Sequence, residues 1–358
     1  MAPRIPVTLL GATGVVGQRF VARLAEHPLF ELRHLCASPR NAGTAYAEAC
    51  TWRVPAPAAD RAYAGLGACT LAAPDPRTAA APVVFSALDC GPAREIEPLF
   101  ARAGALVFSN AAAFRMAPDV PLIIPEVNPD HLALVGVQRS ARAWEGAILC
   151  NPNCTTTVLA LALAPLHETF GVEAVCATSM QALSGAGHPG VSGLDALGNV
   201  LPHIQGEEQK LESETQKLLG RLDAERIEPA DFCVSAHCNR VPVIDGHTLS
   251  VSVRLAAGPS PGAVREVLEA WRPQAARMGL PSAPPVPLCV HAGTDRPQVA
   301  LDVGRDRGMS VHVGRIRACP VLGVKFTCLG HNTERGAAGG SLLVAELARA
   351  RGLLSERP

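Results

Sequence analysis

Near the start of the 358-residue chain stands the sequence Ile5-Pro-Val-Thr-Leu-Leu-Gly-Ala-Thr-Gly-Val-Val-Gly-Gln18. Its residues 5–10 are typical of a short buried strand, and the residues after the last glycine place Phe20, Val21 and Leu24 at helical spacing. The glycines in between allow a tight turn whose backbone N–H groups can approach a pyrophosphate closely. The order of strand, glycine turn and helix therefore predicts a dinucleotide-binding unit.

Further strands alternate with helices downstream of this unit. Their apolar runs and helical patterns fall at residues 31–37, 83–88, 92–103 and 105–108. Such alternation predicts an α/β fold with a Rossmann-like, doubly wound parallel sheet, whose ligands bind beyond the carboxyl ends of the strands. Asp89, Ser109 and Asn110 lie at such ends. Arg115, a few residues later, is either an anion ligand at this edge or an ordinary surface ion-pair residue.

The loop after the second predicted strand indicates which dinucleotide binds. A protein that selects NAD usually places an acidic residue there for the ribose 2′-hydroxyl, whereas a hydroxyl group and an arginine suit a 2′-phosphate. This chain has Ser38 and Arg40 at that point. The sequence therefore favours NADP, with a solvated loop arginine as the alternative.

The middle of the chain holds the candidate nucleophile, Cys154, within Asn151-Pro-Asn-Cys-Thr155. Residues 158–164 are strongly helix-forming, so Asn153 is predicted to cap a helix and Cys154 to lie in its first turn. Unpaired N–H groups and the positive end of the helix dipole favour a thiolate over a thiol there. A buried structural cysteine is the alternative.

A second region follows this helix. Residues 172–183 predict a long strand that carries Gln181 near its end and leads into a glycine-rich loop at 184–190. Such a loop is either a close approach to a cofactor or a plain connection. A helix predicted at 206–219 carries its charges mainly on one side, which is typical of a solvated face.

His247 is the candidate acid/base of this region. After the turn at Asp245-Gly246, the sequence alternates and places His247 on one face of a strand with Leu249 and Val251. The histidine therefore begins the buried face of a sheet. It is either a general acid/base at a pocket edge or a hydrogen-bonded core histidine.

Composition excludes several classes of function. With 32 basic and 32 acidic residues, the formal net charge is zero, which gives no support to nucleic acid or an anionic membrane as partner. The 12 cysteines are scattered without paired spacing, which predicts reduced thiols and no metal site. The N-terminal apolar stretch is too short for a signal peptide or a membrane span, so we expect a cytoplasmic protein acting on small metabolites.

Together these residues indicate one chemistry. A cysteine thiolate attacks an activated acyl carbon, the leaving group departs, and a nicotinamide cofactor delivers hydride to the thioacyl group. Without a cofactor, Cys154 and His247 would equally suit acyl transfer or hydrolysis. The glycine turn at residues 11–17 favours the dehydrogenase.

Ordered motifs cover nearly the whole chain. They are Gly11-Ala-Thr-Gly-Val-Val-Gly-Gln18, Asn151-Pro-Asn-Cys-Thr155, Gln181-Ala-Leu-Ser-Gly-Ala-Gly187, Arg240-Val-Pro-Val-Ile-Asp-Gly-His247, Gly308-Met-Ser-Val-His-Val-Gly-Arg-Ile-Arg317 and Asn332-Thr-Glu-Arg-Gly-Ala-Ala-Gly339. On these motifs the sequence resembles the aspartate-semialdehyde dehydrogenase family, most closely its archaeal and fungal branch. The resemblance implies reversible, NADP-dependent interconversion of aspartyl 4-phosphate and aspartate 4-semialdehyde plus phosphate, in the biosynthesis of lysine, threonine and methionine.

The resemblance also implies a role for each candidate site residue. Cys154 is the implied nucleophile, and His247 the acid/base that manages the hemithioacetal proton. The implied substrate-binding residues are Arg240 for the α-carboxylate, Gln181 for the acyl group, Glu207 for the ammonium, Arg115 and Lys210 for the phosphate, and Asn110. The implied cofactor contacts are Gly11, Thr13, Gly14, Val15, Val16, Gly17, Ser38, Arg40, Ser184, Gly185 and Asn332. The roles of Glu207 and Lys210 run against the solvated face predicted for their helix.

A two-domain architecture follows from the same resemblance. Residues 1–150 with 331–358 are expected to form the dinucleotide-binding domain, and residues 151–330 an α+β catalytic and dimerisation domain with a mixed sheet. The implied assembly is a homodimer or a tetramer.

Two departures from the family pattern leave other functions open. His188 follows Gly187 where an aromatic residue is expected, and Glu334 places an acid near the cofactor side. The alternatives are a malonyl-CoA reductase or a specialised acyl-phosphate reductase of the same fold. N-acetylglutamyl phosphate reductase shares the layout but has a histidine motif that this chain lacks. A silent NADP-binding sensor would not need both Cys154 and His247.

Overall fold

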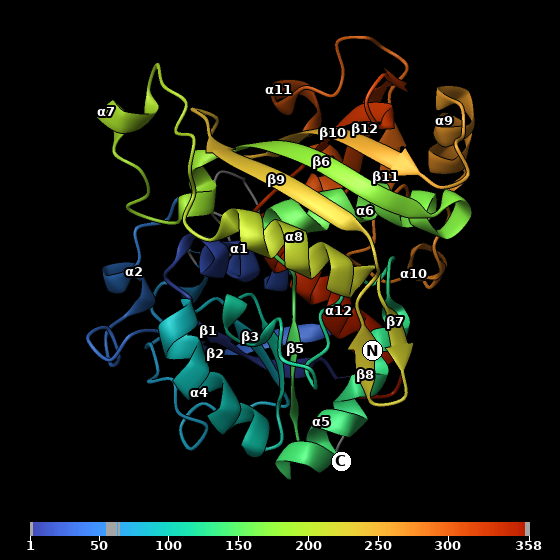
Figure 1. Cartoon of the computed structure of the whole chain (residues 1–358). Coiled ribbons are helices and arrows are strands. Elements are labelled where there is room, and N and C mark those ends of the chain that lie inside the picture. The colour runs from blue at the N-terminus through green and yellow to red at the C-terminus, as the bar shows by residue number, and fades with distance from the viewer. Residues whose placement is uncertain (1–2, 55–62, 64, 355–358) are drawn as a thin grey trace.

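The computed structural model describes residues 3–54, 63 and 65–354 and consists of two main sheets with helices around and between them (Figure 1). One sheet is parallel and the other mixed, so the predicted α/β class is confirmed. In the described residues, no helix combines the length and the apolar character that crossing a bilayer requires. Of the predicted domain ranges, residues 1–2, 55–62, 64 and 355–358 lie outside the described part.

The parallel sheet has the strand order β2-β1-β3-β4-β5. Its strands are β1 (Ile5–Leu10), β2 (Phe30–Cys36), β3 (Val83–Ser86), β4 (Leu106–Ser109) and β5 (Ala147–Cys150). The helices of this part are α1 (Val15–Leu24), α2 (Tyr46–Ala49), α4 (Cys90–Arg102) and α5 (Leu134–Arg142). The strand order reverses between β1 and β3, which is where parallel sheets open a ligand crevice.

The glycine turn brings α1 against the end of β1. The N–H groups of Gly11 and Ala12 donate to the Cys36 carbonyl oxygen at 3.1 and 3.0 Å. A Cβ atom on Gly17 would lie 2.2 Å from the Gly11 carbonyl oxygen, so only glycine permits this packing. The N-cap of α1, Gly14, offers no side-chain cap, and the N–H groups of the first turn remain available to an anion.

The mixed sheet has the strand order β11-β12-β13-β10-β6-β9. Its strands are β6 (Val172–Gln181), β9 (Cys233–Arg240), β10 (His247–Leu255), β11 (Leu288–Val290), β12 (Val311–Cys319) and β13 (Gly323–Gly330). Strand β10 is antiparallel to β6 and β13 and alternates as predicted, because His247, Leu249 and Val251 are buried while Ser250 is exposed. This part of the chain also contains α7 (Gly193–Ala196), α8 (Glu207–Leu218), β7 (Arg221–Asp223), β8 (Arg226–Glu228), α9 (Pro261–Ala270), α10 (Gln274–Arg277) and α11 (Val299–Asp302).

Helix α6 (Cys154–Phe170) lies in the layer between the two sheets (Figure 1). Every residue from Thr155 to Leu166 is buried, which explains why the apolar run lacks a polar face. Asn153 caps the helix, since its Oδ1 accepts from the N–H groups of Thr155 and Thr156 at 2.9 and 3.1 Å. The predicted helix start is therefore confirmed.

The chain returns to the parallel sheet through α12 (Gly339–Ala350), whose Leu342 packs in one core cluster with Val7 and Phe85. The π-helical turn Glu334–Ala338 precedes it. Arg335 in this turn is buried and donates two hydrogen bonds to the Glu126 carboxylate, at 2.7 and 2.6 Å. Each charge neutralises the other in a place that water does not reach.

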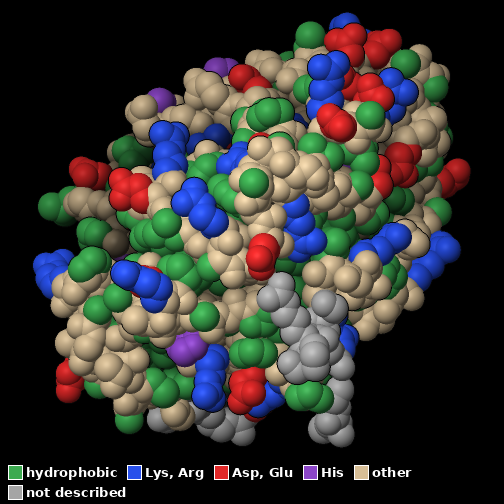
Figure 2. Space-filling view, turned by 90° about the horizontal axis from the view of Figure 1, so that it is seen from below, with side chains coloured by type: hydrophobic (Ala, Val, Ile, Leu, Met, Phe, Trp, Pro, Cys, Tyr) green, Lys and Arg blue, Asp and Glu red, His purple; other side chains and the backbone are tan. Residues whose placement is uncertain are grey.

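The surface carries no extended area of one charge on the face drawn in Figure 2. Lysine and arginine side chains alternate there with acidic ones among apolar and uncharged groups. This mixture matches the formal net charge of zero.

Removal of one member of the buried pair should destabilise the protein strongly. We expect Arg335→Ala to lower the free energy of unfolding by about 3 to 5 kcal/mol, because Glu126 is then a buried charge without a partner. Urea denaturation followed by circular dichroism measures this. The Arg335→Ala/Glu126→Ala double variant should recover part of the loss, and Arg77→Ala, which breaks an exposed pair with Asp75, should leave the midpoint unchanged. A single variant as stable as the parent would contradict this account.

Candidate active site

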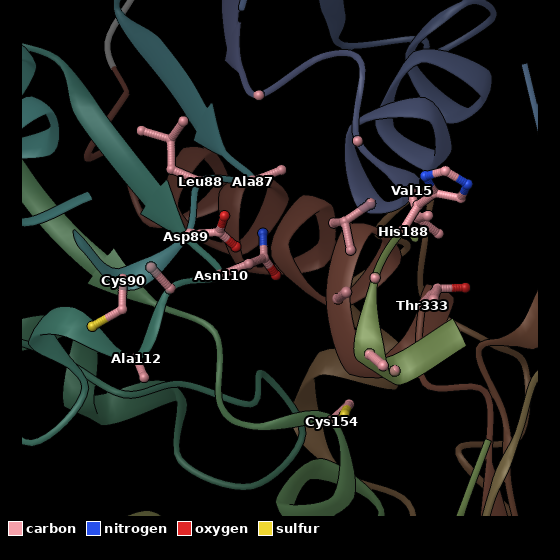
Figure 3. Close-up of a pocket in the computed structure, with 18 of the residues that line it drawn as sticks. Val15, Ala87, Leu88, Asp89, Cys90, Asn110, Ala112, Cys154, His188 and Thr333 are labelled. Carbon is pink, nitrogen blue, oxygen red and sulfur yellow. The ribbon is translucent and has the colours of Figure 1, made fainter. Parts of the chain in front are cut away.

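A cavity of about 780 Å³ opens between the carboxyl ends of the parallel strands and the start of α6 (Figure 3). It is lined by predicted site residues from both regions: Gly11, Thr13, Gly14, Val15, Val16, Ser38, Asn110, Arg115, Cys154, Gln181, Ser184, Gly185, Glu207, Lys210 and Asn332. His247 and Arg240 are buried behind this lining. Gly17 packs against the backbone of the glycine turn and does not line the cavity. Arg40 is exposed and is not part of the lining either. The structure thus brings the predicted residues together, apart from Arg40.

The candidate nucleophile and acid/base lie side by side. The Cys154 Sγ atom is 3.2 Å from His247 Nε2, although 93 positions separate the two residues in the chain. His247 Nδ1 accepts a hydrogen bond from the Ala182 N–H at 3.1 Å. In the neutral ring the proton therefore resides on Nε2 and faces the sulfur, where it stabilises negative charge.

Burial controls the protonation of both groups. It raises the pKa of the Cys154 thiol to about 12, with the Glu207 carboxylate acting in the same direction and Arg115 against it. Burial also lowers the pKa of His247 to about 3, and the Arg240 charge adds to that effect. The thiolate predicted from the helix start is therefore wrong for this structure, because desolvation outweighs the helix dipole. A neutral thiol beside a neutral imidazole is the stable pair.

Glu207, the first residue of α8, is the hydrogen-bonding centre of the pocket. Its carboxylate accepts from Asn153 Nδ2 at 2.9 and 3.1 Å, from Gln181 Nε2 at 3.3 Å and from Lys210 Nζ at 2.8 Å. Burial alone would raise the pKa of Glu207, but Lys210 and these amides hold it below the usual range. Glu207 is therefore ionised, and the solvated face predicted for its helix is wrong at this position.

Arg115 and Lys210 form the cationic corner of the cavity. Arg115 is buried and donates from Nη1 to Glu214 at 3.1 Å and from Nη2 to the Asn110 carbonyl oxygen at 2.6 Å. Its Nε has no hydrogen-bond partner in the described part of the chain. Because Arg115 is not on the surface, the alternative of a surface ion pair is excluded. Two cations that line one cavity suit a phosphate group.

Gln181 and Arg240 lie side by side because they are register partners at the ends of the parallel strands β6 and β9. Arg240 donates from Nη1 to the Ala182 carbonyl oxygen at 2.7 Å, and its Nε lacks a partner among the described residues. A buried guanidinium with an unused N–H group is suited to a carboxylate ligand.

Asn332 connects the expected cofactor side to the acid/base. Its Oδ1 accepts from the Gly246 N–H at 2.8 Å, immediately before His247, and its Nδ2 donates to Ser184 Oγ at 2.7 Å. The His188 side chain lies at the rim near Val15 and Thr333 (Figure 3).

Glu334, the other departure, is not part of the cavity lining. It forms ion pairs with Arg19, at 3.2 Å, and with Arg23, both on α1. These arginines neutralise it, so the acid does not change the charge of the pocket.

Sequence patterns did not indicate three residues of the site, Glu214, Lys217 and Gly336. Glu214 and Lys217 share a helix face with Glu207 and Lys210, and this spacing is the signal that could have found them. A Cβ atom on Gly336 would lie 2.5 Å from the Cβ of Cys154, so the turn before α12 packs directly on the nucleophile. No local pattern could indicate that contact, because the two residues are remote in the chain.

One cluster outside the cavity has the residue types of a metal site, which the sequence does not predict. His291, Asp302 and His312 offer ligand atoms within 4.8 Å of one another. Both oxygens of Asp302 accept hydrogen bonds from the Arg296 guanidinium, and His291 Nε2 and His312 Nδ1 form a hydrogen bond of 3.0 Å. A cation would have to displace Arg296, so the cluster is a hydrogen-bonded network. All 12 cysteines are free thiols, as predicted.

Comparison with known proteins matches both halves of the chain. Residues 6–135 match the model of the semialdehyde dehydrogenase NAD binding domain, and residues 163–335 match that of the semialdehyde dehydrogenase dimerisation domain. The aspartate-semialdehyde dehydrogenase of Archaeoglobus fulgidus is 50% identical over 96% of this chain and 98% of its own length. The enzyme of the same name from Cryptococcus neoformans is 46% identical over 98% of this chain and 99% of its own length.

A solved structure agrees with these matches in three dimensions. The crystal structure of aspartate semialdehyde dehydrogenase with NADP from Candida albicans superimposes with a TM-score of 0.89 at 41% identity, covering 98% of this chain and 100% of that one. Domain models, full-length relatives and fold agree with the cysteine–histidine pair beside a glycine turn. The chain belongs to the aspartate-semialdehyde dehydrogenase family.

Proposed function

We propose that the protein catalyses the NADP-dependent reductive dephosphorylation of aspartyl 4-phosphate to aspartate 4-semialdehyde, reversibly and through a thioacyl group on Cys154. The observation that carries the proposal is the 3.2 Å approach of Cys154 to His247 inside a cavity that also holds the glycine turn and the Arg115–Lys210 corner. Its relatives bear the name of this activity. The reaction places the enzyme in the biosynthesis of lysine, threonine and methionine.

The residues present fit a nicotinamide dinucleotide. Gly17 leaves no Cβ in the turn, and the N-terminus of α1 offers uncapped N–H groups where a pyrophosphate would bind. We infer that this turn, with Ser38, Arg40, the Ser184-Gly185 loop and Asn332, holds NADP. NADPH, when bound, supplies the hydride.

The substrate is held by its charged groups. Arg240 binds the α-carboxylate with its free N–H group, Glu207 binds the ammonium, and Gln181 orients the acyl group. Arg115 and Lys210 bind the phosphate and stabilise the charge that it carries as it leaves. Asn110 fixes Arg115 through its carbonyl oxygen.

Cys154 and His247 carry out the covalent steps. The Cys154 thiol attacks the acyl carbon and gives its proton to the phosphate oxygen of the breaking carbon–oxygen bond, so phosphate leaves as hydrogen phosphate. After hydride addition the hemithioacetal oxygen is anionic, and the Nε2–H of His247, which faces the sulfur, stabilises it by a hydrogen bond. As the carbon–sulfur bond breaks, Nε2 passes its proton to Sγ and regains one from solvent. Cleavage of the carbon–sulfur bond then releases the aldehyde and regenerates the cysteine.

The proposal also covers the domains of the protein, its assembly and its location. Residues 1–150 with 331–358 form the cofactor domain and residues 151–330 the catalytic domain. The protein is an oligomer, since its second half matches a dimerisation domain, and we propose a homodimer or a tetramer of the same chain. We place it in the cytoplasm, where reduced thiols persist.

Turnover of aspartate 4-semialdehyde tests the function. We expect NADPH absorbance to rise only when protein, aspartate 4-semialdehyde, inorganic phosphate and NADP are all present. Cys154→Ser should reduce the rate by at least about 10³-fold, because a hydroxyl is a poor nucleophile, while NADPH fluorescence on binding is retained. Cys176→Ser, an exposed cysteine on β6, serves as the matched control. An enzyme inert to this substrate but active on malonyl-CoA would overturn the assignment.

Arg40 should determine the preference for NADP. We expect Arg40→Ala to raise the KM for NADPH about tenfold by removing the partner of the 2′-phosphate, with little change for NADH. Steady-state kinetics with both cofactors measure this, and Arg33→Ala, an exposed arginine on the preceding strand, is the control. Equal losses with both cofactors would contradict a contact to the 2′-phosphate.

The charge of Glu207 should control the ionisation of the nucleophile. Because the carboxylate raises the pKa of Cys154, Glu207→Gln should lower that pKa by roughly one unit. The rate of Cys154 alkylation by iodoacetamide at a fixed pH below the pKa should then rise about tenfold, since the thiolate fraction rises by that factor. Glu266→Gln, exposed on α9, should have no effect. An unchanged or slower alkylation would show that the carboxylate does not act on the sulfur.

A further inference from the structure

One face of α8 carries charges that serve the site from inside the protein. Glu207, Lys210, Glu214 and Lys217 follow one another at helical spacing, and Glu214 is only 2% exposed. Lys217 donates from Nζ to three carbonyl oxygens, those of Arg115, Ala117 and Val120, at 2.7 to 2.9 Å. The loop that carries Arg115 is therefore fixed to α8.

The Glu214 carboxylate joins two remote parts of the cavity. Oε1 accepts from Arg115 Nη1 at 3.1 Å, and Oε2 accepts from the backbone N–H of Asn153 at 2.6 Å. Asn153 directly precedes the nucleophile. A single side chain thus spans the distance between the cationic corner and the start of α6.

This bridge has a consequence for the geometry of the reaction. Burial alone would lower the pKa of Arg115, but the charge and hydrogen bond of Glu214, together with weaker contributions from nearby thiols, raise it above its usual value, so the guanidinium remains charged. Its unpartnered Nε remains for an anion. Because the sulfur and the leaving phosphate are bound to the same carbon in the tetrahedral intermediate of acyl transfer, the positions of their two binding sites must be fixed closely.

We propose that Glu214 is a positioning residue that sets the anion-binding Arg115 relative to the Cys154 nucleophile. It touches neither substrate nor cofactor and acts through the two groups that it holds. The inference deepens the proposed function and rests on it, since it assigns phosphate to the Arg115 corner.

Glu214→Gln tests the bridge with little change of shape. The amide oxygen can still accept from Asn153 N–H, but the amide nitrogen cannot accept from Arg115. We expect the KM for inorganic phosphate, in the direction of aspartate 4-semialdehyde oxidation, to rise about 10- to 100-fold with a smaller fall in kcat. The Kd of inorganic phosphate, measured by calorimetry on the NADP-loaded protein, should rise by a similar factor, and the rate of Cys154 alkylation should fall by a much smaller factor.

Matched variants separate positioning from folding. Glu212→Gln lies on the same helix but accepts from Ala236 N–H away from the cavity, and it should leave the phosphate KM unchanged. Glu214→Asp keeps the charge but is too short to reach both partners, so it should still raise the phosphate KM. If Glu214→Gln does not fold, the phosphate KM of Glu214→Asp still tests the proposal.

The outcomes distinguish the two proposals. If the parent protein does not oxidise aspartate 4-semialdehyde, the proposed function fails, whereas calorimetry with phosphate still tests the bridge. If the parent is active and both Glu214 variants bind phosphate as the parent does, the positioning role is overturned. Equal losses in phosphate binding and in Cys154 alkylation would also overturn it, since they would indicate general damage to the site.

Discussion

The start of α6 is the constraint on which the site depends. A helix that begins inside the protein leaves backbone N–H groups that water cannot reach, so the chain itself must provide every acceptor. Asn153 provides one with its side-chain oxygen, and it is held in turn by Glu207 at its amide and by Glu214 at its backbone N–H. The sulfur one residue later therefore has a single position relative to the cationic corner, to Arg240 and to His247.

Much of the fold could be predicted because local patterns and long-range packing agree. The glycine turn, the apolar strands and the alternation of β10 each describe a segment whose burial follows from its own sequence. The pairing of Cys154 with His247 was predicted from motifs, and its geometry follows from two element ends, since the first residue of α6 meets the first residue of β10. Strand order and register place Gln181 and Arg240 together in the same way.

The burial of the charged site residues could not be predicted, because it depends on what packs against them. The α8 face resembles a solvated surface in its sequence, yet Glu214 and Lys217 are enclosed by partners about 60 to 100 positions away. The predicted ionisation of Cys154 is wrong for the same reason. The thiol is desolvated by everything that surrounds it in the cavity, which the sequence of its helix does not indicate. Glu334 leaves the charge of the pocket unchanged because two arginines of α1 form ion pairs with it.

Asn332 and Gly336 lie late in the chain, so the pocket depends on the last segment to be synthesised. Asn332 fixes the turn before His247, and Gly336 packs on Cys154, so the pocket gains these two walls only after the last tenth of the chain has docked. During synthesis, the cysteine emerges long before the histidine and the closing turn. In a partly made chain the thiol therefore lacks its histidine and its substrate-binding partners, and the sulfur meets them only in the finished molecule.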